Sequence, residues 1–264
     1  MAKNTDSTKV LSTNLRLPRS HIFKTAFVQA FQFLLVHLFL KTDLMKIGVL
    51  GTGVVGEAIA SALIQRDHYV MLGSRTATNE KAERWAKKAG KHASHGRFEE
   101  VTNSGDLIFL CLNGEHALNV VRDLNPEFLH NKILVDLTNP LDFTKGTPPR
   151  IIEGLGNGTS LGEEIQKLLP NTYVVKTLNT VNYKLMVDAR LVNNADHDLF
   201  ISGNNADAKN KVKHFLVDNF HWKADRLIDL GGIETARTTE AIVPFWVSVW
   251  QNLGTPLFNF KVVH

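Results

Sequence analysis

Cysteine is almost absent from this 264-residue chain, which contains one, Cys111. A single thiol forms no internal disulfide and supplies no cysteine cluster for a metal, so we predict no metal site of this kind. Cys111 lies in the apolar run Leu107–Leu112, where we expect a small buried side chain. The scarcity of cysteine excludes a disulfide-stapled scaffold and suits a reducing cytoplasm.

An excess of basic charge is missing from most of the chain. The formal net charge of +4 comes from residues 1–44, because basic and acidic residues are equal in number over 45–264. No basic face with interleaved aromatic residues is found there, and we therefore expect no nucleic-acid partner.

A long apolar run is also missing. The most apolar stretch, Ala26–Leu40, has 15 residues and includes polar ones, which is short for a membrane span. No small-residue cleavage site follows it, so a signal peptide is not expected. Two interpretations of the 1–44 extension stay open: an upstream start codon before a domain that begins at Met45, or an amphipathic anchor or packing helix. We expect a cytoplasmic protein, in which only residues 20–40 could contact a membrane.

A glycine-rich loop follows the apolar strand predicted from Lys46. Its glycines stand in the GxGxxG spacing and lead directly into a helical pattern, which is typical of a dinucleotide-binding turn. The first glycine permits the tight turn, the second lets the backbone approach a pyrophosphate, and the third lets the helix pack on the strand. We predict cofactor contacts from the whole loop: Gly51, Thr52, Gly53, Val54, Val55 and Gly56.

The carboxylate that binds the ribose in NAD sites is missing after the second predicted strand, Tyr69–Gly73. Ser74 and Arg75 occupy that position, and Lys81 follows. A guanidinium forms a bidentate, charge-assisted contact with a phosphate, and a hydroxyl adds a donor. These residues favour NADP(H) over NAD(H). The alternative is that Arg75 and Lys81 are ordinary solvated charges.

Apolar strands alternate with helices along the rest of the chain. Helices are expected at 79–91, 117–124, 164–169 and 206–219, strands at 107–112, 132–137, 172–178, 198–202 and 226–230, and one closing helix at 234–250. This pattern predicts an α/β fold: a Rossmann-type, doubly wound, mostly parallel sheet with helices on both faces and a small C-terminal α/β extension. The predicted division is 1–44, an N-terminal extension; 45–180, an NADP-binding domain; and 181–264, a C-terminal extension.

Residues at strand ends are the candidate site residues, because ligands of such sheets bind beyond the carboxyl ends of the strands. They are Leu112 and Asn113, Asn139 and Pro140, and Asn179. The amides of Asn139 and Asn179 suit a carboxamide or a ring carbonyl, although turn-forming asparagines are common at such positions. His116 is a further positioning candidate, equally consistent with a packed or capping residue. No acid–base catalyst is assigned, since hydride transfer depends on positioning.

Several other features receive structural interpretations. Arg237 and Glu240, three apart on the closing helix, are expected to pair with each other. Phe245, Trp246 and Trp250 are expected in the core or in a dimer interface. A second glycine cluster at 154–162 follows Pro148-Pro149 and no apolar strand, and we interpret it as a mobile connection near the site.

Taken together, these motifs resemble the NADPH-dependent coenzyme F-420 reductases, and they are also similar to the cytosolic reductase domain of the STEAP metalloreductases. The resemblance covers 45–264 and rests on the glycine loop, the Ser74-Arg75 turn, Glu115-His116, residues 160–164, 174–179 and 201–205. It implies hydride transfer between NADP(H) and a deazaflavin or flavin as co-substrate, and a homodimer. The family's deazaflavin reductases tend to have an apolar or aromatic residue before the Glu-His pair, where this chain has Asn113-Gly114.

Three classes of function follow from the sequence. The first is an NADPH-dependent oxidoreductase with a small-molecule redox acceptor of the flavin or deazaflavin type. The second is an imino- or keto-acid reductase of the pyrroline-5-carboxylate reductase kind, which would need a longer, all-helical C-terminal domain. The third is a non-enzymatic NADP(H) sensor or electron-input domain.

Overall fold

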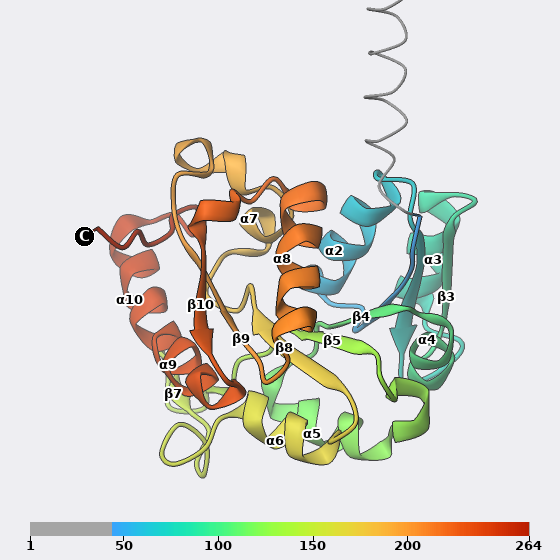
Figure 1. Cartoon of the computed structure of the whole chain (residues 1–264), viewed down its shortest axis with the longest axis horizontal. Coiled ribbons are helices and arrows are strands. Elements are labelled where there is room, and N and C mark those ends of the chain that lie inside the picture. The colour runs from blue at the N-terminus through green and yellow to red at the C-terminus, as the bar shows by residue number, and fades with distance from the viewer. Residues whose placement is uncertain (1–43, 264) are drawn as a thin grey trace, which may run out of the picture. The chain divides into compact units, whose positions relative to one another are not determined.

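An eight-stranded sheet forms the centre of the chain. The computed structural model describes residues 44–263, and the expectations for the N-terminal extension lie outside them. The strand order is β10-β9-β8-β5-β4-β1-β2-β3, and every neighbouring pair is parallel except β8 and β9. Figure 1 shows β10 and β3 on opposite sides of the molecule. The strands are β1 (Lys46–Leu50), β2 (Tyr69–Ser74), β3 (Ala93–Arg97), β4 (Leu107–Leu110), β5 (Ile133–Asp136), β8 (Tyr173–Thr177), β9 (Leu199–Ser202) and β10 (Leu227–Gly231).

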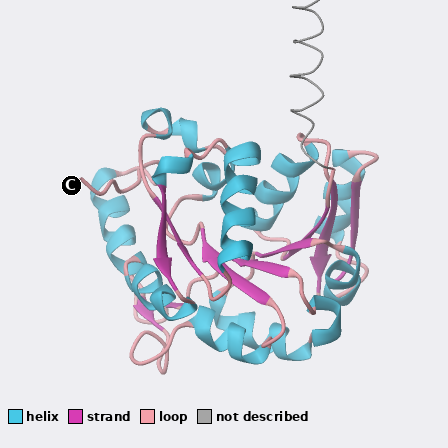
Figure 2. Ribbon diagram, viewed as in Figure 1, coloured by secondary structure: helices cyan, strands magenta, loops and turns pink. Residues whose placement is uncertain are grey.

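Helices cover both faces of the sheet, as Figure 2 shows by colour. Adjacent strand residues point to opposite faces, and Val49 and Leu50 of β1 accordingly belong to two separate hydrophobic clusters. The first cluster includes residues of α2 (Val54–Ile64), α3 (Glu80–Ala89), α7 (Tyr183–Val187) and α8 (Ala206–Phe220). The second includes residues of α4 (Phe98–Ser104), α5 (Gly114–Asp123), α6 (Leu161–Leu168) and α9 (Ala236–Ala241). The Rossmann-type, mostly parallel fold predicted from the sequence is confirmed.

The end of the chain differs from the predicted single helix. It consists of α9 and α10 (Val243–Leu253), with the break at Ile242. Pro244 lies in the first turn of α10, where its missing N–H leaves no bond unmade, so it marks the start of a second helix. The strands of the C-terminal part, β9 and β10, extend the same sheet.

Three short strands were not predicted. β3 (Ala93–Arg97) has no apolar periodicity to signal it, because it is an edge strand with one buried residue, Gly96. β6 (Leu141–Asp142) and β7 (Arg150–Ile151) form a two-stranded hairpin of their own. The hairpin leaves from the end of β5.

The strand order reverses direction beside β1. β2 follows β1 in sequence and pairs with it on one side, whereas β4 pairs with it on the other. The connections after β1 and β4 therefore separate at this point and leave a crevice at the carboxyl ends of the strands. The glycine loop lies there.

The entry of the chain into β1 is held by a buried histidine. His68 is inaccessible to solvent, and its Nδ1 accepts from the backbone N–H of Met45 at 3.2 Å. Its Nε2 lies 2.9 Å from Asn219 Oδ1 on α8. Within residues 44–263, none of the helices has the length and apolar character needed to cross a bilayer.

Candidate functional site: a pocket beside the glycine loop and an asparagine pair

The glycine loop has the backbone geometry that its spacing predicts. Gly51 has a φ of 122°, and a Cβ there would lie 2.5 Å from the carbonyl oxygen of Cys111. A Cβ on Gly56 would lie 1.9 Å from the carbonyl oxygen of Gly51, so the helix packs against the loop only with glycine. Around Gly53 there is open space, with nothing within 4 Å of an added Cβ. The loop thus leaves room for a ligand at its middle glycine and at the N-terminus of α2.

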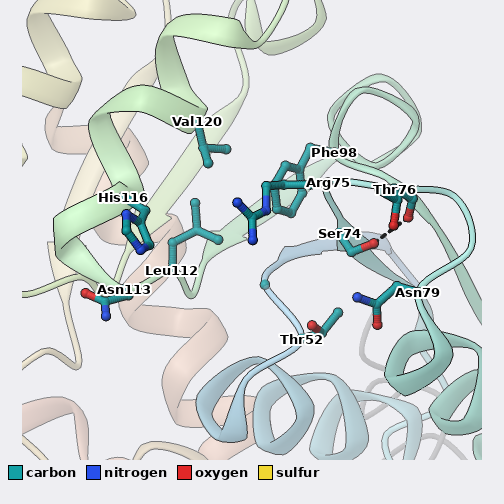
Figure 3. A pocket seen from close by; sticks show the side chains of 11 residues that line it. Thr52, Ser74, Arg75, Thr76, Asn79, Phe98, Leu112, Asn113, His116 and Val120 are labelled. Carbon is teal, nitrogen blue, oxygen red and sulfur yellow. Dashed lines mark hydrogen bonds between the residues drawn. The ribbon is translucent and has the colours of Figure 1, made fainter.

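A pocket of about 550 Å³ lies beside this loop. Figure 3 shows the Arg75 guanidinium pointing into it toward Leu112 and Val120. The lining residues are Gly51, Thr52, Ser74, Arg75, Thr76, Asn79, Phe98, Leu112, Asn113, His116 and Val120. None of these residues carries a carboxylate. Within the described residues, the pocket lining therefore has no negatively charged side chain that would repel an anionic ligand.

The three predicted phosphate-binding residues differ in their placement. Arg75 is exposed at the pocket. Ser74 is buried, and its hydroxyl donates to the carbonyl oxygen of Thr76 at 2.5 Å, as the dashed line in Figure 3 marks. Lys81 is exposed on α3 and does not line the pocket. Arg75 is therefore the residue best placed to contact a phosphate from this side.

Sequence reasoning missed several lining residues. Asn79 caps α3, with its side chain accepting from the N–H of Ala82, which leaves its amide nitrogen for other partners. Phe98 is the first residue of α4 and Val120 lies on α5. Phe98 follows β3, and without that strand its position in space is not predictable. Asn79 had a usable signal, since it precedes the helical pattern as an N-cap residue.

Asn113, Gly114 and His116 form the start of α5. Asn113 is the N-cap, and its side chain accepts from the N–H of Glu115 at 3.0 Å. A Cβ on Gly114 would lie 2.0 Å from the carbonyl oxygen of Asn139. His116 is exposed and lines the pocket. Gly114 is thus the residue that lets α5 approach the end of β5.

Asn139 and Asn179 bind each other at the ends of β5 and β8. Asn139 Nδ2 donates to the backbone oxygen of Asn179 at 2.7 Å, and Asn179 Nδ2 donates to Asn139 Oδ1 at 2.9 Å. Asn179 Nδ2 also lies 3.0 Å from the carbonyl oxygen of Thr239 on α9. Asn139 is partly exposed, whereas Asn179 and Pro140 are buried. The pair is a fixed unit, in which Asn139 is the more accessible member.

The predicted pairing of Arg237 with Glu240 is wrong. Arg237 forms a bidentate ion pair with Glu163 of α6. Glu240 is completely buried and pairs with Lys176 of β8 at 2.8 Å. Neighbours three apart on a helix pair when both are exposed, but α9 packs on α6 and offers better partners to each residue. Glu163 is buried, which opposes its ionisation, yet hydrogen bonds from Arg237 and Ser160 hold its pKa below the ordinary value.

Cys111 is buried at the end of β4, as the sequence predicted. Burial raises the pKa of its thiol far above the ordinary value, and the negative charge of Asp136 adds to this effect. The thiol is therefore neutral and unsuited to nucleophilic chemistry. Across residues 44–263, no cluster of three or more His, Cys, Asp or Glu side chains has a metal-binding arrangement.

Comparison with known proteins decides the family. The family model described as NADP oxidoreductase, coenzyme F420-dependent, matches residues 46–140. The F420-dependent NADP reductase of Methanocaldococcus jannaschii is 32% identical over 215 residues, covering 78% of this chain and 92% of that protein. The chain belongs to the F420-dependent NADP reductase family.

Other relatives of this reductase agree with that assignment. A crystal structure from Arthrobacter sp. FB24, described as a candidate F420-dependent NADP reductase, is 40% identical with a TM-score of 0.76 and covers 83% of this chain and 100% of that one. The rat metalloreductase STEAP3 is 27% identical, over 76% of this chain and 38% of that protein. The chain is an NADP-dependent oxidoreductase. The C-terminal part holds β9 and β10, so it is not the all-helical domain that the imino-acid reductase interpretation requires.

Proposed function

We propose that this reductase transfers hydride between NADP(H) and a flavin or a deazaflavin of the coenzyme F420 type. The observation that carries the proposal is the pocket of about 550 Å³, which joins the glycine loop to Arg75 and whose lining within residues 44–263 has no carboxylate. The names of the relatives support the deazaflavin as one of the acceptors to test.

Different residues of the pocket bind different parts of NADP(H). Open space at Gly53 and the free N–H groups of α2 receive the pyrophosphate. Arg75 binds the 2′-phosphate, with Thr76 and Asn79 as neighbouring polar groups. The apolar side chains of Phe98, Leu112 and Val120 form a wall suited to an adenine ring.

The strand ends position the reacting rings. The cofactor supplies a hydride at its nicotinamide carbon, and no protein acid or base is needed for that step. Asn139, next to Pro140, is partly exposed at the end of β5, and the second N–H of its amide, beyond the one bonded to Asn179, is offered to the nicotinamide carboxamide or to a carbonyl of the acceptor ring. His116 lines the pocket as a further positioning group.

Two further parts of the proposal concern the setting of the enzyme. Exposed Phe245 and Trp250 on α10 support a homodimer, because large apolar side chains on a surface favour a partner. The single cysteine supports a reducing, cytoplasmic environment. Membrane contact through residues 20–40 stays a separate hypothesis.

The test is NADPH oxidation by the full chain with FMN, FAD, coenzyme F420, a quinone and a ferric chelate, each also tested with NADH. We expect turnover with the deazaflavin or a flavin and a clear preference for NADPH. Turnover of none of these acceptors, with NADPH still bound, would favour the sensor interpretation. Reduction of an imino acid alone would favour the second enzymatic class.

A further inference from the structure

Three completely buried ionic side chains meet beneath the ends of β5 and β8. Lys176 and Asp136 are register partners on these strands, and Lys176 Nζ lies 2.9 Å from Asp136 Oδ2. The same nitrogen lies 2.8 Å from Glu240 Oε1 of α9. All three side chains have no solvent exposure. We call these residues the Lys176 cluster.

The charges in the cluster depend on one another. Burial alone would lower the pKa of Lys176, but Asp136 and Glu240 raise it above its ordinary value, so the ammonium is retained. Burying ions is costly, and well-packed apolar residues of similar size often stabilise a core equally well. A contribution to stability therefore does not explain why ionic residues occupy these positions. The three partners around the nitrogen of Lys176 do fix the relative positions of the segments that carry them.

The segments fixed by the cluster all border the candidate site. Lys176 Nζ donates to the carbonyl oxygen of Thr138 at 2.6 Å, one residue before Asn139. Glu240 accepts from the N–H groups of Leu161 and Gly162 at 2.8 and 3.0 Å, and so caps α6. The ends of β5 and β8, the start of α6, and α9 are thereby joined through two side chains.

The connection continues from the cluster to the asparagine pair. Leu178, fully buried, has a φ of 63°, a left-handed conformation that is unfavourable for a large side chain. This left-handed residue turns the chain directly after β8, before Asn179. Asn179 then binds Asn139 and the carbonyl oxygen of Thr239, the neighbour of Glu240. The strained turn is thus held at both ends.

We infer that Lys176 and Glu240 are positioning residues for the nicotinamide half of NADP(H), acting through the Asn139–Asn179 pair. The inference rests on the proposed function in placing the nicotinamide at these strand ends. The adenosine half binds at Arg75 and is independent of the cluster, because no member of the cluster lines that pocket.

The test separates the two halves of the cofactor and needs no acceptor. Full-length Glu240→Gln and Lys176→Met are titrated with NADPH and with 2′,5′-ADP, which carries only the adenosine half. We expect the Kd of 2′,5′-ADP to stay within about twofold, while the Kd of NADPH rises about tenfold or more. We also expect the fluorescence anisotropy of the bound, reduced nicotinamide to fall.

Lys209→Met is the matched control. Lys209 is also nearly buried and also binds one carboxylate, Asp229, and one carbonyl oxygen, that of Gly231, but it lies on α8. Its replacement should leave both affinities and the anisotropy unchanged. Equal weakening of both ligands, or wild-type behaviour of Glu240→Gln, would overturn the inference. If Lys176→Met does not fold, Glu240→Gln decides alone. A protein that turns over no flavin or deazaflavin would refute the proposed reaction but leave this binding result intact.

Discussion

Gly114 lies directly against Asn139, since a Cβ at position 114 would stand 2.0 Å from the carbonyl oxygen of Asn139. Helix propensity alone predicts that Gly114→Ala, at the first position of α5, stabilises the helix by at most about 1 kcal/mol. The contact predicts the opposite sign: a loss of about 1–3 kcal/mol from overpacking, together with displacement of Asn139 and a lower rate of NADPH oxidation.

The midpoint of urea unfolding and the steady-state rate measure this effect. Asn119→Ala, at an exposed position of the same helix, is the control: it loses the exposed hydrogen bond from Arg122 but gains helix propensity, so the free energy of unfolding should change by less than about 0.5 kcal/mol. A Gly114→Ala protein that is more stable than the wild type and fully active would contradict this prediction, because it would show that the backbone at the end of β5 can shift without loss of stability or activity.

Arg75→Ala should remove much of the preference for NADPH over NADH. A charge-assisted hydrogen bond contributes about 1.5–3 kcal/mol, so the ratio of the two dissociation constants should fall roughly 10- to 100-fold. Lys81→Ala is the matched control, because Lys81 lies outside the pocket lining. Isothermal titration of both variants with NADPH and NADH measures these ratios. Equal affinity of the wild type for the two cofactors would contradict the assignment of Arg75 to the 2′-phosphate.

Gly53→Val should abolish NADPH binding while the protein stays folded. Gly53 has a φ of −78° and a ψ of 179°, an extended conformation open to any residue, and its Cβ position is free of neighbours. The valine side chain would occupy the space proposed for the pyrophosphate. Calorimetry and the circular dichroism spectrum test the two parts separately, and wild-type affinity in a folded variant would refute this placement.

Acid should destabilise the fold through His221. Partial burial and the positive charges of Arg66 and Arg190 lower its pKa from the ordinary value of 6.5, against a smaller opposing effect of Asp188. Arg66 donates to Nε2 of the neutral ring. Because the unfolded chain takes up this proton more readily, stability should decrease as the pH falls through 6.5 toward the lowered pKa.

Thermal unfolding between pH 8 and pH 5 measures this dependence. His221→Asn removes the titration and retains the left-handed backbone, φ 61°, which asparagine tolerates well. Its melting temperature should vary less over this range than that of the wild type. Identical slopes for the two proteins would show that His221 carries no part of the dependence.

A chain comprising 45–264 should fold cooperatively and bind NADPH as the full chain does. Among residues 44–263, the pocket and both hydrophobic clusters are formed by residues from Met45 onward. The N–H of Met45 donates to His68, and an amino terminus at this position retains a donor for that bond. Loss of a cooperative transition, or of NADPH binding, would show that residues 1–44 belong to the folded unit. Sedimentation of the full chain with lipid vesicles would support an anchor.

The sequence predicted the parts of the molecule that depend on local pattern. The glycine loop, the buried strands β4, β5 and β8, and the turn at Ser74 and Arg75 each follow from spacing or from an apolar run. Residues whose role depends on distant partners were missed or wrong. Phe98 enters the pocket only because an irregular edge strand precedes it. Glu240 was predicted to pair with its helix neighbour, because nothing in the local sequence shows that α9 lies over the buried ammonium of Lys176.

Because Cys111 is buried, the reactivity of its thiol reports how often the end of β4 is transiently exposed to solvent. The only thiol of the protein lies at the end of β4, next to the pocket residue Leu112. A thiol-reactive dye modifies it only in those molecules that have transiently exposed this strand end, so the labelling rate measures how often the floor of the site opens. No cysteine needs to be introduced or removed. Labelling slowed by NADPH would give the free energy by which the bound dinucleotide holds the site closed.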